Sequence, residues 1–279
     1  MPGSEPSIEE SSTGIAPEGL WLEPRLRARG VPHGLTLAAL GDMKRPARRA
    51  EALAAAGRPG LLPCTLLQRH GIRVHEARVG GDYALASGAA RLEGDGWVCA
   101  APGLFTAIYV ADCLPLFVWD DRDLSVVGVF HAGWRGLAAG MPRAAVGAFE
   151  RLGVGPERLS AAVGPHAGAC CYKVGPELRE HFRPSSFRAG GKNLLPAPAA
   201  GPSAAGTSRK ENDLRLDLGA EAREQFSEAG VDASRVSVSE ECTICGRGYH
   251  SFRRDKQDLR MMAFIAIPAA PSAGGPSCS

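Results

Sequence analysis

Hydrophobic runs separated by turn residues fill the middle of the chain. The segments at 105–110 (FTAIYV) and 116–119 (LFVW) are rich in β-branched and aromatic residues and predict two strands around a proline-containing turn. The segment at 124–130 (LSVVGVF) is almost continuously apolar, as expected of a buried strand. Further strands are predicted at 159–163, 236–238 and 262–267.

Apolar residues recur at helical spacing directly after the buried strand. The pattern from Leu137 to Leu152 predicts one helix, and Pro142 is compatible with it only near its start. Other helices are predicted at 45–56, 176–182 and 214–228. This mixture predicts an α+β (mixed α/β) fold, a single domain with mixed β-sheets flanked by helices. Local pattern alone does not decide between an α/β and an α+β arrangement.

Three segments have the composition of exposed chain. Residues 1–17, 188–211 and 268–279 are rich in small and polar residues and proline, and we predict two disordered tails and a low-complexity insertion in one catalytic domain spanning 18–267. Residues 1–20 lack the basic and apolar regions of a signal peptide. No apolar run approaches the roughly 18 residues that a membrane span needs. We therefore expect a cytoplasmic protein.

Charge and cysteine content narrow the partners. The chain of 279 residues has 32 Lys and Arg against 30 Asp and Glu, a net charge of +2, which gives no indication of a nucleic-acid or membrane partner. Its eight cysteines are irregularly spaced in a chain too long for a small disulfide scaffold, so we expect a reducing compartment. The oligomeric state cannot be predicted from these features.

Reactive side chains follow two predicted strands. Asp112 and Cys113 come after FTAIYV, and His131 comes after LSVVGVF and opens the glycine-rich segment HAGWRG. His70, in QRHG, is a third candidate. One thiolate and two imidazoles suit zinc and leave a fourth coordination position open. The separations of 43 and 18 residues match no local zinc motif, so only the fold can bring the three together.

Other cysteines, histidines and acids have simpler explanations. A lone cysteine is most often a small core residue. Cys242 and Cys245 form one C-x-x-C pair with no second pair, and we interpret it as structural or incidental. The adjacent Cys170 and Cys171 suggest no mechanism. Asp95, in LEGDG, is interpreted as a turn residue.

Three arginines are candidates for binding an anion. Arg135 lies four residues after His131, and Arg253 and Arg254 lie together in HSFRRD. The guanidinium group binds phosphate or carboxylate with two parallel hydrogen bonds. Surface ion pairs, for example with Asp255, are the alternative.

These segments resemble a known family. ADCLPLFVWD, VVGVFHAGWRGLAAG, AVGPHAGACCYKVG and CTICGRGYHSFRRD occur in the order of the signature blocks of the YfiH family, also called the multicopper polyphenol oxidase (laccase) family. The resemblance spans about residues 31–267. It implies that His70, Cys113 and His131 are metal ligands.

The chain also departs from the family pattern. The arginine of an early Thr-Arg pair is missing near Leu37, and Lys173 replaces the glutamate of CCYEVG. Lys256 and Leu259 stand where glycines are usual. The predicted metal ligands are intact, so these departures affect the expected substrate-contacting rim.

The resemblance implies a zinc-dependent purine nucleoside phosphorylase, with a purine nucleoside and phosphate as substrates and adenosine deamination as a further activity. Arg135, with Arg253 or Arg254, would hold phosphate, and Asp112 would orient a ligand or contact ribose. A copper-dependent polyphenol oxidase is the alternative, but seven histidines without a His-x-His pair do not suit a multicopper centre. An inactive nucleoside-binding relative and a Cys113–His131 cysteine hydrolase also stay open.

Overall fold

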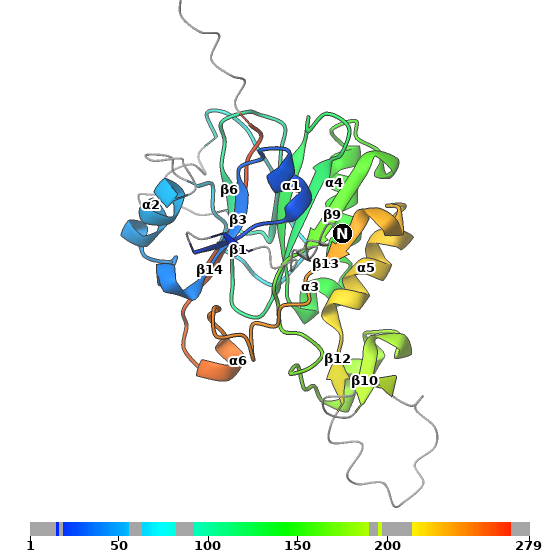
Figure 1. Cartoon of the computed structure of the whole chain (residues 1–279). Helices are drawn as coiled ribbons and strands as arrows, with labels where there is room; N and C mark the ends of the chain where they lie inside the picture. The colour runs from blue at the N-terminus through cyan, green and yellow to red at the C-terminus, as the bar shows by residue number, and fades with distance from the viewer. Residues whose placement is uncertain are drawn as a thin grey trace, which may run out of the picture.

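In the part of the chain that the structure describes, the computed structural model consists of three β-sheets and the helices packed against them (Figure 1). The structure describes residues 15–16, 19–55, 63–81, 92–189, 195–196 and 214–268. The predicted tails at 1–17 and 268–279 and the predicted insertion at 188–211 therefore lie almost wholly outside the described residues.

The largest sheet has six strands in the order β13-β9-β7-β8-β5-β4. Its two central strands, β7 (Leu114–Asp120) and β8 (Val127–Ala132), are antiparallel and buried at every residue. The remaining strands are β4 (Val74–Ala77), β5 (Gly96–Cys99), β9 (Leu159–Val163) and β13 (Val236–Val238). Because both faces of β7 and β8 are covered, their apolar runs are continuous rather than alternating.

A second sheet packs against one face of the first. Its order is β1-β2-β3-β14-β6, and its central strand β14 (Met261–Ile265) pairs antiparallel with both neighbours. The other strands are β1 (Ile15–Ala16), β2 (Leu20–Trp21), β3 (His33–Thr36) and β6 (Thr106–Val110). Leu35 and Ile108 of this sheet share one core with Phe117 and Trp97 of the six-stranded sheet. Two sheets thus enclose an apolar layer that holds them together.

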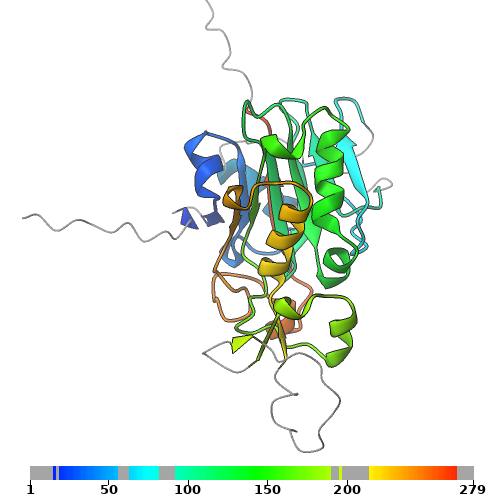
Figure 2. The same cartoon turned by 90° about the vertical axis from the view of Figure 1, so that its right-hand side faces the viewer.

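Helices cover the opposite face of the six-stranded sheet. In Figure 2, α4 (Met141–Glu150) and α5 (Leu218–Glu228) lie side by side against it. Phe149 and Phe226 from these helices are fully buried with Phe130 of β8. The remaining helices are α1 (Pro24–Ala28), α2 (Pro46–Ala55), α3 (Trp134–Ala138) and α6 (Phe252–Asp255). A small third sheet contains β10 (Phe187–Ala189), β11 (Leu195–Pro196) and β12 (Arg215–Leu216).

The arrangement confirms the predicted α+β class, but two predicted helices differ in extent. The helix predicted from Leu137 to Leu152 is divided into α3 and α4 at Gly140. Gly140 has a φ of 88°, in the left-handed region that glycine adopts without strain. The helix predicted at 214–228 begins only at Leu218, after the two residues of β12. Asp217 caps it by accepting a hydrogen bond from the backbone amide of Ala220 at 3.0 Å.

Two further elements are shorter or tighter than predicted. The strand predicted from Leu124 begins at Val127, because Leu124 has a φ of 59° and cannot continue an extended strand. The predicted helix at 176–182 is a 3₁₀ turn over Pro176–Glu180.

Candidate metal centre

The structure brings the three predicted ligand residues together. His70 lies in the loop before β4, Cys113 directly precedes β7, and His131 lies in β8. Their ligand atoms all fall within 4.8 Å of one another. The two imidazole rings meet edge to face, with centroids 4.8 Å apart. These residues are 43 and 18 positions apart in sequence, so their meeting is a product of the fold.

Strand pairing explains how two of the donors become neighbours. In the β7–β8 pair, Leu114 lies opposite Ala132 and Pro115 opposite His131. The start of one strand is therefore beside the end of the other, which places Cys113 near His131 and the turn that follows it.

Two glycines of HAGWRG are required by close packing. A Cβ at Gly133 would lie 2.9 Å from His70 Cδ2 and 3.1 Å from Cys113 Sγ. A Cβ at Gly136 would lie 3.0 Å from the carbonyl oxygen of Gly71. Neither glycine has the left-handed φ that would itself demand glycine. They are needed because α3 approaches the His70 loop without space for a side chain.

Asp95 positions two of the three donor residues. From the sequence it is interpreted only as a turn residue, which misses this role. Its buried carboxylate accepts a hydrogen bond from His131 Nδ1 at 2.8 Å, with Nδ1 assigned as the donor because its partner is a carboxylate. It also accepts the backbone amides of Arg69, His70 and Gly71 at 3.1, 2.9 and 2.8 Å. One carboxylate thus orients the ring of one donor and the backbone of another.

Strained backbone marks the same place. His70 has a φ of 60° and Asp112, beside Cys113, a φ of 82°, both in the left-handed region that side chains rarely adopt. The three amides bound by Asp95 hold His70 in this conformation. Strain of this kind persists where the surroundings over-determine it, often at functional sites.

The electrostatics favour a thiolate beside an imidazolium. Burial raises the pKa of the Cys113 thiol, but His131 and His70 outweigh it and the pKa falls to about 6. Burial lowers the pKa of His131, but the charges and hydrogen bonds of Cys113 and Asp95 outweigh it and the pKa rises to about 9. Cys113 is therefore ready to act as an anionic ligand.

The donor set fits a metal ion. One sulfur and two imidazole nitrogens match the ligands that zinc and copper take, and three ligands leave one position open. His131 is buried, Cys113 half-buried and His70 exposed, so the group is accessible from one side.

A cavity of about 660 Å³ opens over these donors. Its further lining includes the apolar Leu66, Leu67 and Phe252 and the charged Lys44, Asp258 and Arg260. Phe252 exposes 49% of its surface, unusual for an aromatic side chain. Asp258 bridges Lys44 Nζ at 2.6 Å and Arg260 Nη2 at 2.5 Å. An aromatic face and the cations of Lys44, Arg49 and Arg260 thus share one cavity with the donor group.

Gln68 fixes the wall between His70 and β6. Its side-chain amide donates to the carbonyl of Tyr109 at 2.8 Å and accepts from the Tyr109 amide at 2.7 Å. The side chain therefore replaces a strand neighbour for β6.

The four predicted substrate-binding residues lie apart from this lining. Asp112 is buried, and its two oxygens accept hydrogen bonds from Thr243 Oγ1 and the Arg253 amide, each at 2.7 Å. The Arg254 guanidinium donates to four backbone carbonyls of 243–249. These contacts indicate that both side chains stabilise the loops behind Cys113.

The other two predicted residues flank a separate, smaller hollow of about 340 Å³. Arg253 lines it, donating to the Lys173 carbonyl at 2.8 Å and stacking over the Tyr172 ring. Arg135 is exposed and its guanidinium lies 4.3 Å from the centroid of the Trp134 ring, which also lines this hollow.

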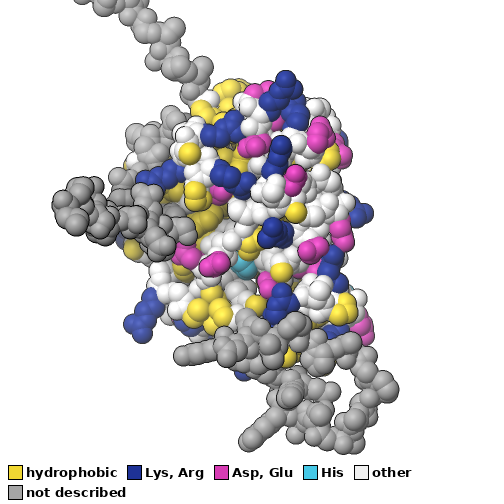
Figure 3. All heavy atoms as spheres, turned by 45° about the vertical axis from the view of Figure 1, so that its right-hand side comes forward, with side chains coloured by type: hydrophobic (Ala, Val, Ile, Leu, Met, Phe, Trp, Pro, Cys, Tyr) yellow, Lys and Arg dark blue, Asp and Glu magenta, His cyan; other side chains and the backbone are white. Residues whose placement is uncertain are grey.

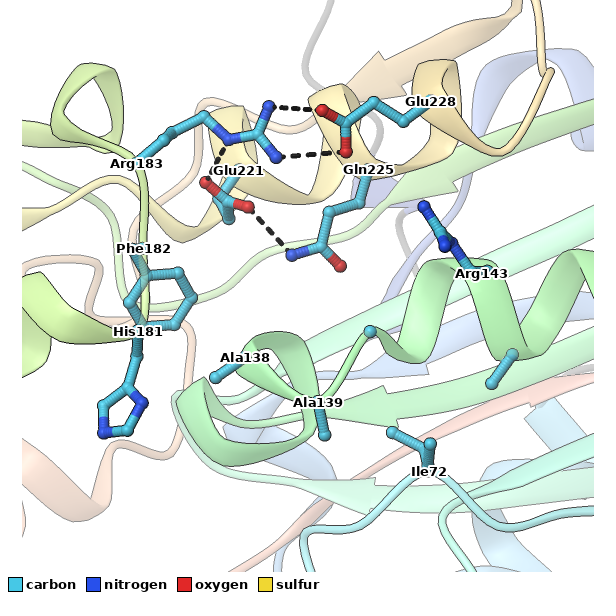
Figure 4. Close-up of a pocket in the computed structure, with 12 residues that line it drawn as sticks. Ile72, Ala138, Ala139, Arg143, His181, Phe182, Arg183, Glu221, Gln225 and Glu228 are labelled. Atoms are coloured by element: carbon cyan, nitrogen blue, oxygen red, sulfur yellow. Dashed lines mark hydrogen bonds and ion pairs between the residues drawn. The ribbon is translucent and has the colours of Figure 1, made fainter.

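Another cavity, of about 500 Å³, contains none of the three donors (Figure 4). Several of its polar groups are engaged with each other, since Arg183 pairs with Glu221 at 3.1 Å and with Glu228 at 2.9 Å. Glu221 also accepts a hydrogen bond from Gln225 at 2.8 Å. These groups hold α5 to the neighbouring loop.

Basic and acidic side chains are interspersed over the face shown in Figure 3. That face therefore carries no extended single-sign patch of the kind that binds a nucleic-acid backbone. Among the described residues, no helix has the length and apolar character that a membrane crossing needs.

Fold and site together define a mixed α+β protein with a Cys/His donor group in a cavity. A family model described as "Multi-copper polyphenol oxidoreductase laccase" matches residues 40–268, so the chain belongs to this family. The YfiH resemblance predicted from the signature segments is thereby confirmed.

Relatives carry two activities in their names. The chain is 34% identical over 249 residues to a purine nucleoside phosphorylase of Deinococcus radiodurans, a match covering 87% of each chain. It is 32% identical over 157 residues to adenosine deaminase RL5 of an unknown prokaryotic organism, covering 56% of this chain and 55% of that protein. The crystal structure of YlmD from Geobacillus stearothermophilus matches with a TM-score of 0.72 at 26% identity, covering 91% and 98% of the two chains.

Proposed function

We propose that this protein is a zinc-dependent purine nucleoside phosphorylase that cleaves adenosine- or inosine-type nucleosides with phosphate. The observation that carries the proposal is the convergence of His70, Cys113 and His131 in a cavity large enough for a nucleoside. Two relatives from this family, named for purine nucleoside chemistry, support it.

His70, Cys113 and His131 would hold the metal, which would supply Lewis-acid polarisation at its open position. Zinc fits this donor set better than a multicopper centre does. Within the described parts of the chain, only two groups contain three or more candidate ligands, and the second consists of cysteines alone. A trinuclear copper cluster needs many more histidines than this cavity offers.

The protein's own side chains position the reactants. Asp95 fixes the His131 ring and leaves Nε2 as the nitrogen free to face the donor group. Phe252 offers an exposed π-face on which a purine can stack. In phosphorolysis a phosphate oxygen bonds to the anomeric carbon, the glycosidic C–N bond breaks, and its electron pair leaves with the purine. Placing phosphate beside that carbon is therefore the main task of the cavity.

Two sets of basic side chains are candidates for holding phosphate. Arg260 and Lys44 line the cavity beside the donors, and both pair with the Asp258 carboxylate. A phosphate oxygen could take the place of that carboxylate as their partner. Arg135 is the candidate predicted from sequence, and it lies by the smaller hollow with Arg253. We favour Arg260 because it shares the cavity of His70 and Cys113.

Adenosine deamination is a second candidate activity. A donor group with an open position suits activation of water for attack on the purine ring, and one relative is named an adenosine deaminase. The two reactions give different products, so one assay separates them.

The test incubates purified protein with adenosine or inosine, with and without phosphate, and separates the products by chromatography. We expect phosphate-dependent free base and ribose 1-phosphate, and inosine from adenosine if deamination also occurs. Cys113→Ala should abolish turnover, while Cys64→Ala, which removes a buried thiol outside the donor group, should retain it. The proposal fails if no purine nucleoside gives a phosphate-dependent product.

A second experiment assigns the phosphate ligand. Arg260→Ala should raise the KM for phosphate and lower kcat/KM by roughly 10- to 150-fold, since a charged hydrogen-bonded contact is typically worth about 1.5–3 kcal/mol. Arg135→Ala is the matched control, and metal content is measured on both. If only Arg135→Ala changed the KM for phosphate, the phosphate site would be assigned to the smaller hollow instead.

A further inference from the structure

Four cysteines from two distant segments converge away from the donor group in the cavity. The sulfur atoms of Cys170, Cys171, Cys242 and Cys245 all lie within 4.8 Å of one another. Cys170 Sγ and Cys245 Sγ are 3.8 Å apart. All four are free thiols, and none belongs to the His70–Cys113–His131 group. The lone C-x-x-C pair of the sequence thus gains its second pair from the adjacent Cys170 and Cys171.

The spacing suits one tetrahedral ion. Zinc–sulfur bonds of about 2.3 Å directed to the corners of a tetrahedron separate the sulfurs by about 3.8 Å. This equals the Cys170–Cys245 distance. A disulfide would need sulfurs about 2.05 Å apart. An iron–sulfur cluster would place some of the four sulfurs farther apart than 4.8 Å, because its own iron and sulfide atoms lie between the cysteines.

The backbone is arranged around one of the sulfurs. The amide of Gly168, which lies in the other segment, donates to Cys242 Sγ at 3.3 Å. A backbone amide directed at a sulfur favours the thiolate, the form in which cysteine binds metals. The backbone of one segment is thus directed at a sulfur of the other.

Two glycines leave room for the cluster. A Cβ at Gly168 would lie 3.1 Å from Cys242 Cβ and 3.4 Å from Cys170 Sγ. A Cβ at Gly246 would lie 2.6 Å from the Cys242 carbonyl oxygen, whose hydrogen bond with the Gly246 amide closes the turn at 2.8 Å. A side chain at Gly168 would crowd the place where the two segments meet, and one at Gly246 would clash within the 242–246 turn.

We propose that Cys170, Cys171, Cys242 and Cys245 bind one zinc ion in a closed, structural four-cysteine site. All four positions around the ion are filled by protein, so this site has no open position for substrate. Its role is to fasten the 168–171 loop to the 242–246 turn. The inference does not depend on the proposed phosphorylase activity.

The fastened turn supports the cavity indirectly. Thr243, next to Cys242, donates to Asp112, and Asp112 precedes Cys113. The same Asp112 carboxylate accepts the amide of Arg253 at the start of α6. A zinc ion in the four-cysteine site would therefore hold the backbone behind one ligand of the other centre.

The test measures zinc per chain in full-length protein purified under reducing conditions and reconstituted with zinc chloride. In Cys113→Ala, which disrupts the cavity group, we expect one tightly held zinc. X-ray absorption at the zinc edge should show four sulfur neighbours at about 2.3 Å and no nitrogen. Adding Cys245→Ser to this variant should remove that zinc and lower the melting temperature, whereas adding Cys64→Ala should leave the zinc in place.

The Cys113→Ala measurement keeps all four cluster cysteines, so the proposal stays testable if Cys245→Ser does not fold. Absence of zinc from reconstituted Cys113→Ala, nitrogen or oxygen neighbours in its spectrum, or an iron cluster in place of zinc would overturn it. The proposal would also be overturned if the four cysteines formed disulfides in protein freshly purified under reducing conditions, which a thiol titration would detect.

Discussion

At the scale of single residues, Asp95 has the widest influence on the candidate metal centre. Its carboxylate holds the His131 ring and the amides of three successive residues around His70. Such a shared acceptor couples the orientation of two donors that lie far apart in sequence. Its loss should therefore weaken both donors together.

Asp95→Asn should lower zinc affinity by about 10- to 100-fold, because an amide cannot accept hydrogen bonds on both of its ends. Competition with a chelator of known affinity measures this. Glu93→Gln is the matched control, since Glu93 is exposed in the same loop and pairs with Arg69 at the surface. Equal affinities for Asp95→Asn and the parent protein would contradict the role assigned to Asp95.

Gly133→Ala should also impair metal binding, since its new Cβ would press on His70 and Cys113 at 2.9 and 3.1 Å. Metal content after dialysis against a weak chelator gives the readout. Gly147→Ala provides the comparison: this helical position has space, and alanine there should stabilise α4 by about 1 kcal/mol. If the Gly133→Ala and Gly147→Ala proteins retained metal equally well, the His70 loop would have moved to accommodate the new Cβ, and the close packing at Gly133 would not be required for metal binding.

At the scale of elements, the sequence predicts buried strands best. FTAIYV and LFVW fall within or beside β6 and β7, and the strands predicted at 159–163 and 236–238 match β9 and β13. Prediction fails where one residue interrupts a pattern, as at Gly140, whose left-handed backbone divides α3 from α4. The order of strands in the sheets is not accessible to local pattern, because it depends on pairing between distant segments.

The candidate site divides in the same way. The three donors are predictable because Cys113, His131 and His70 each lie in a distinctive motif. That they come together could be predicted only from the family resemblance, because their spacing matches no local metal motif. Asp95 is not predictable, because aspartate beside glycine also has the signature of a turn. The four-cysteine group is missed because its two halves lie about seventy residues apart, and neither half alone matches a complete metal motif.

The turn after β7 gives a prediction about acid stability. Burial opposes ionisation of Asp120, but the hydrogen bonds that it accepts from Ser125 and Arg158 outweigh it and its pKa falls to about 2. Its folded-state pKa thus lies below the ordinary value of about 3.9, so its contribution is present above about pH 4 and is lost as pH falls toward 2. Asp120→Asn should cost about 2 kcal/mol at pH 7 and about half of that at pH 3.

Urea unfolding at the two pH values measures this difference. Asp232→Asn serves as the control, because Asp232 is exposed and caps only a short 3₁₀ turn. A stability loss for Asp120→Asn that does not change with pH would show that packing, and not charge, explains the effect.

At the scale of the whole molecule, Arg25 joins the N-terminal part of the chain to the edge of the six-stranded sheet. From α1 it donates to the carbonyls of Ala161 and Arg235 at 2.9 and 3.0 Å. Its guanidinium also lies 4.7 Å from the centroid of the Trp119 ring. The Arg25 side chain therefore contacts β9, β7 and the residue before β13 of the six-stranded sheet, whereas α1 itself lies between β2 and β3 of the other sheet.

Arg25→Ala should destabilise the protein by about 1–3 kcal/mol, because it removes charged hydrogen bonds between α1 and the six-stranded sheet and leaves two part-buried carbonyls without this donor. Chemical denaturation gives the free energy of unfolding. Arg27→Ala, an exposed arginine on the same helix, should change it by less than about 0.5 kcal/mol. Equal effects of the two substitutions would mean that Arg25 acts only through helix propensity.

The pairing of β3 with β14 also has a consequence for biosynthesis. β3 ends at Thr36, but its partner is complete only at Ile265, about 230 residues later. At about 5–20 residues per second, a ribosome needs roughly 10 to 50 seconds to supply that partner. During this interval β3 has an open edge where β14 will later insert, and unpaired edges are templates for wrong partners. The edge of β3 is therefore exposed to wrong pairing until nearly all of the chain has been translated.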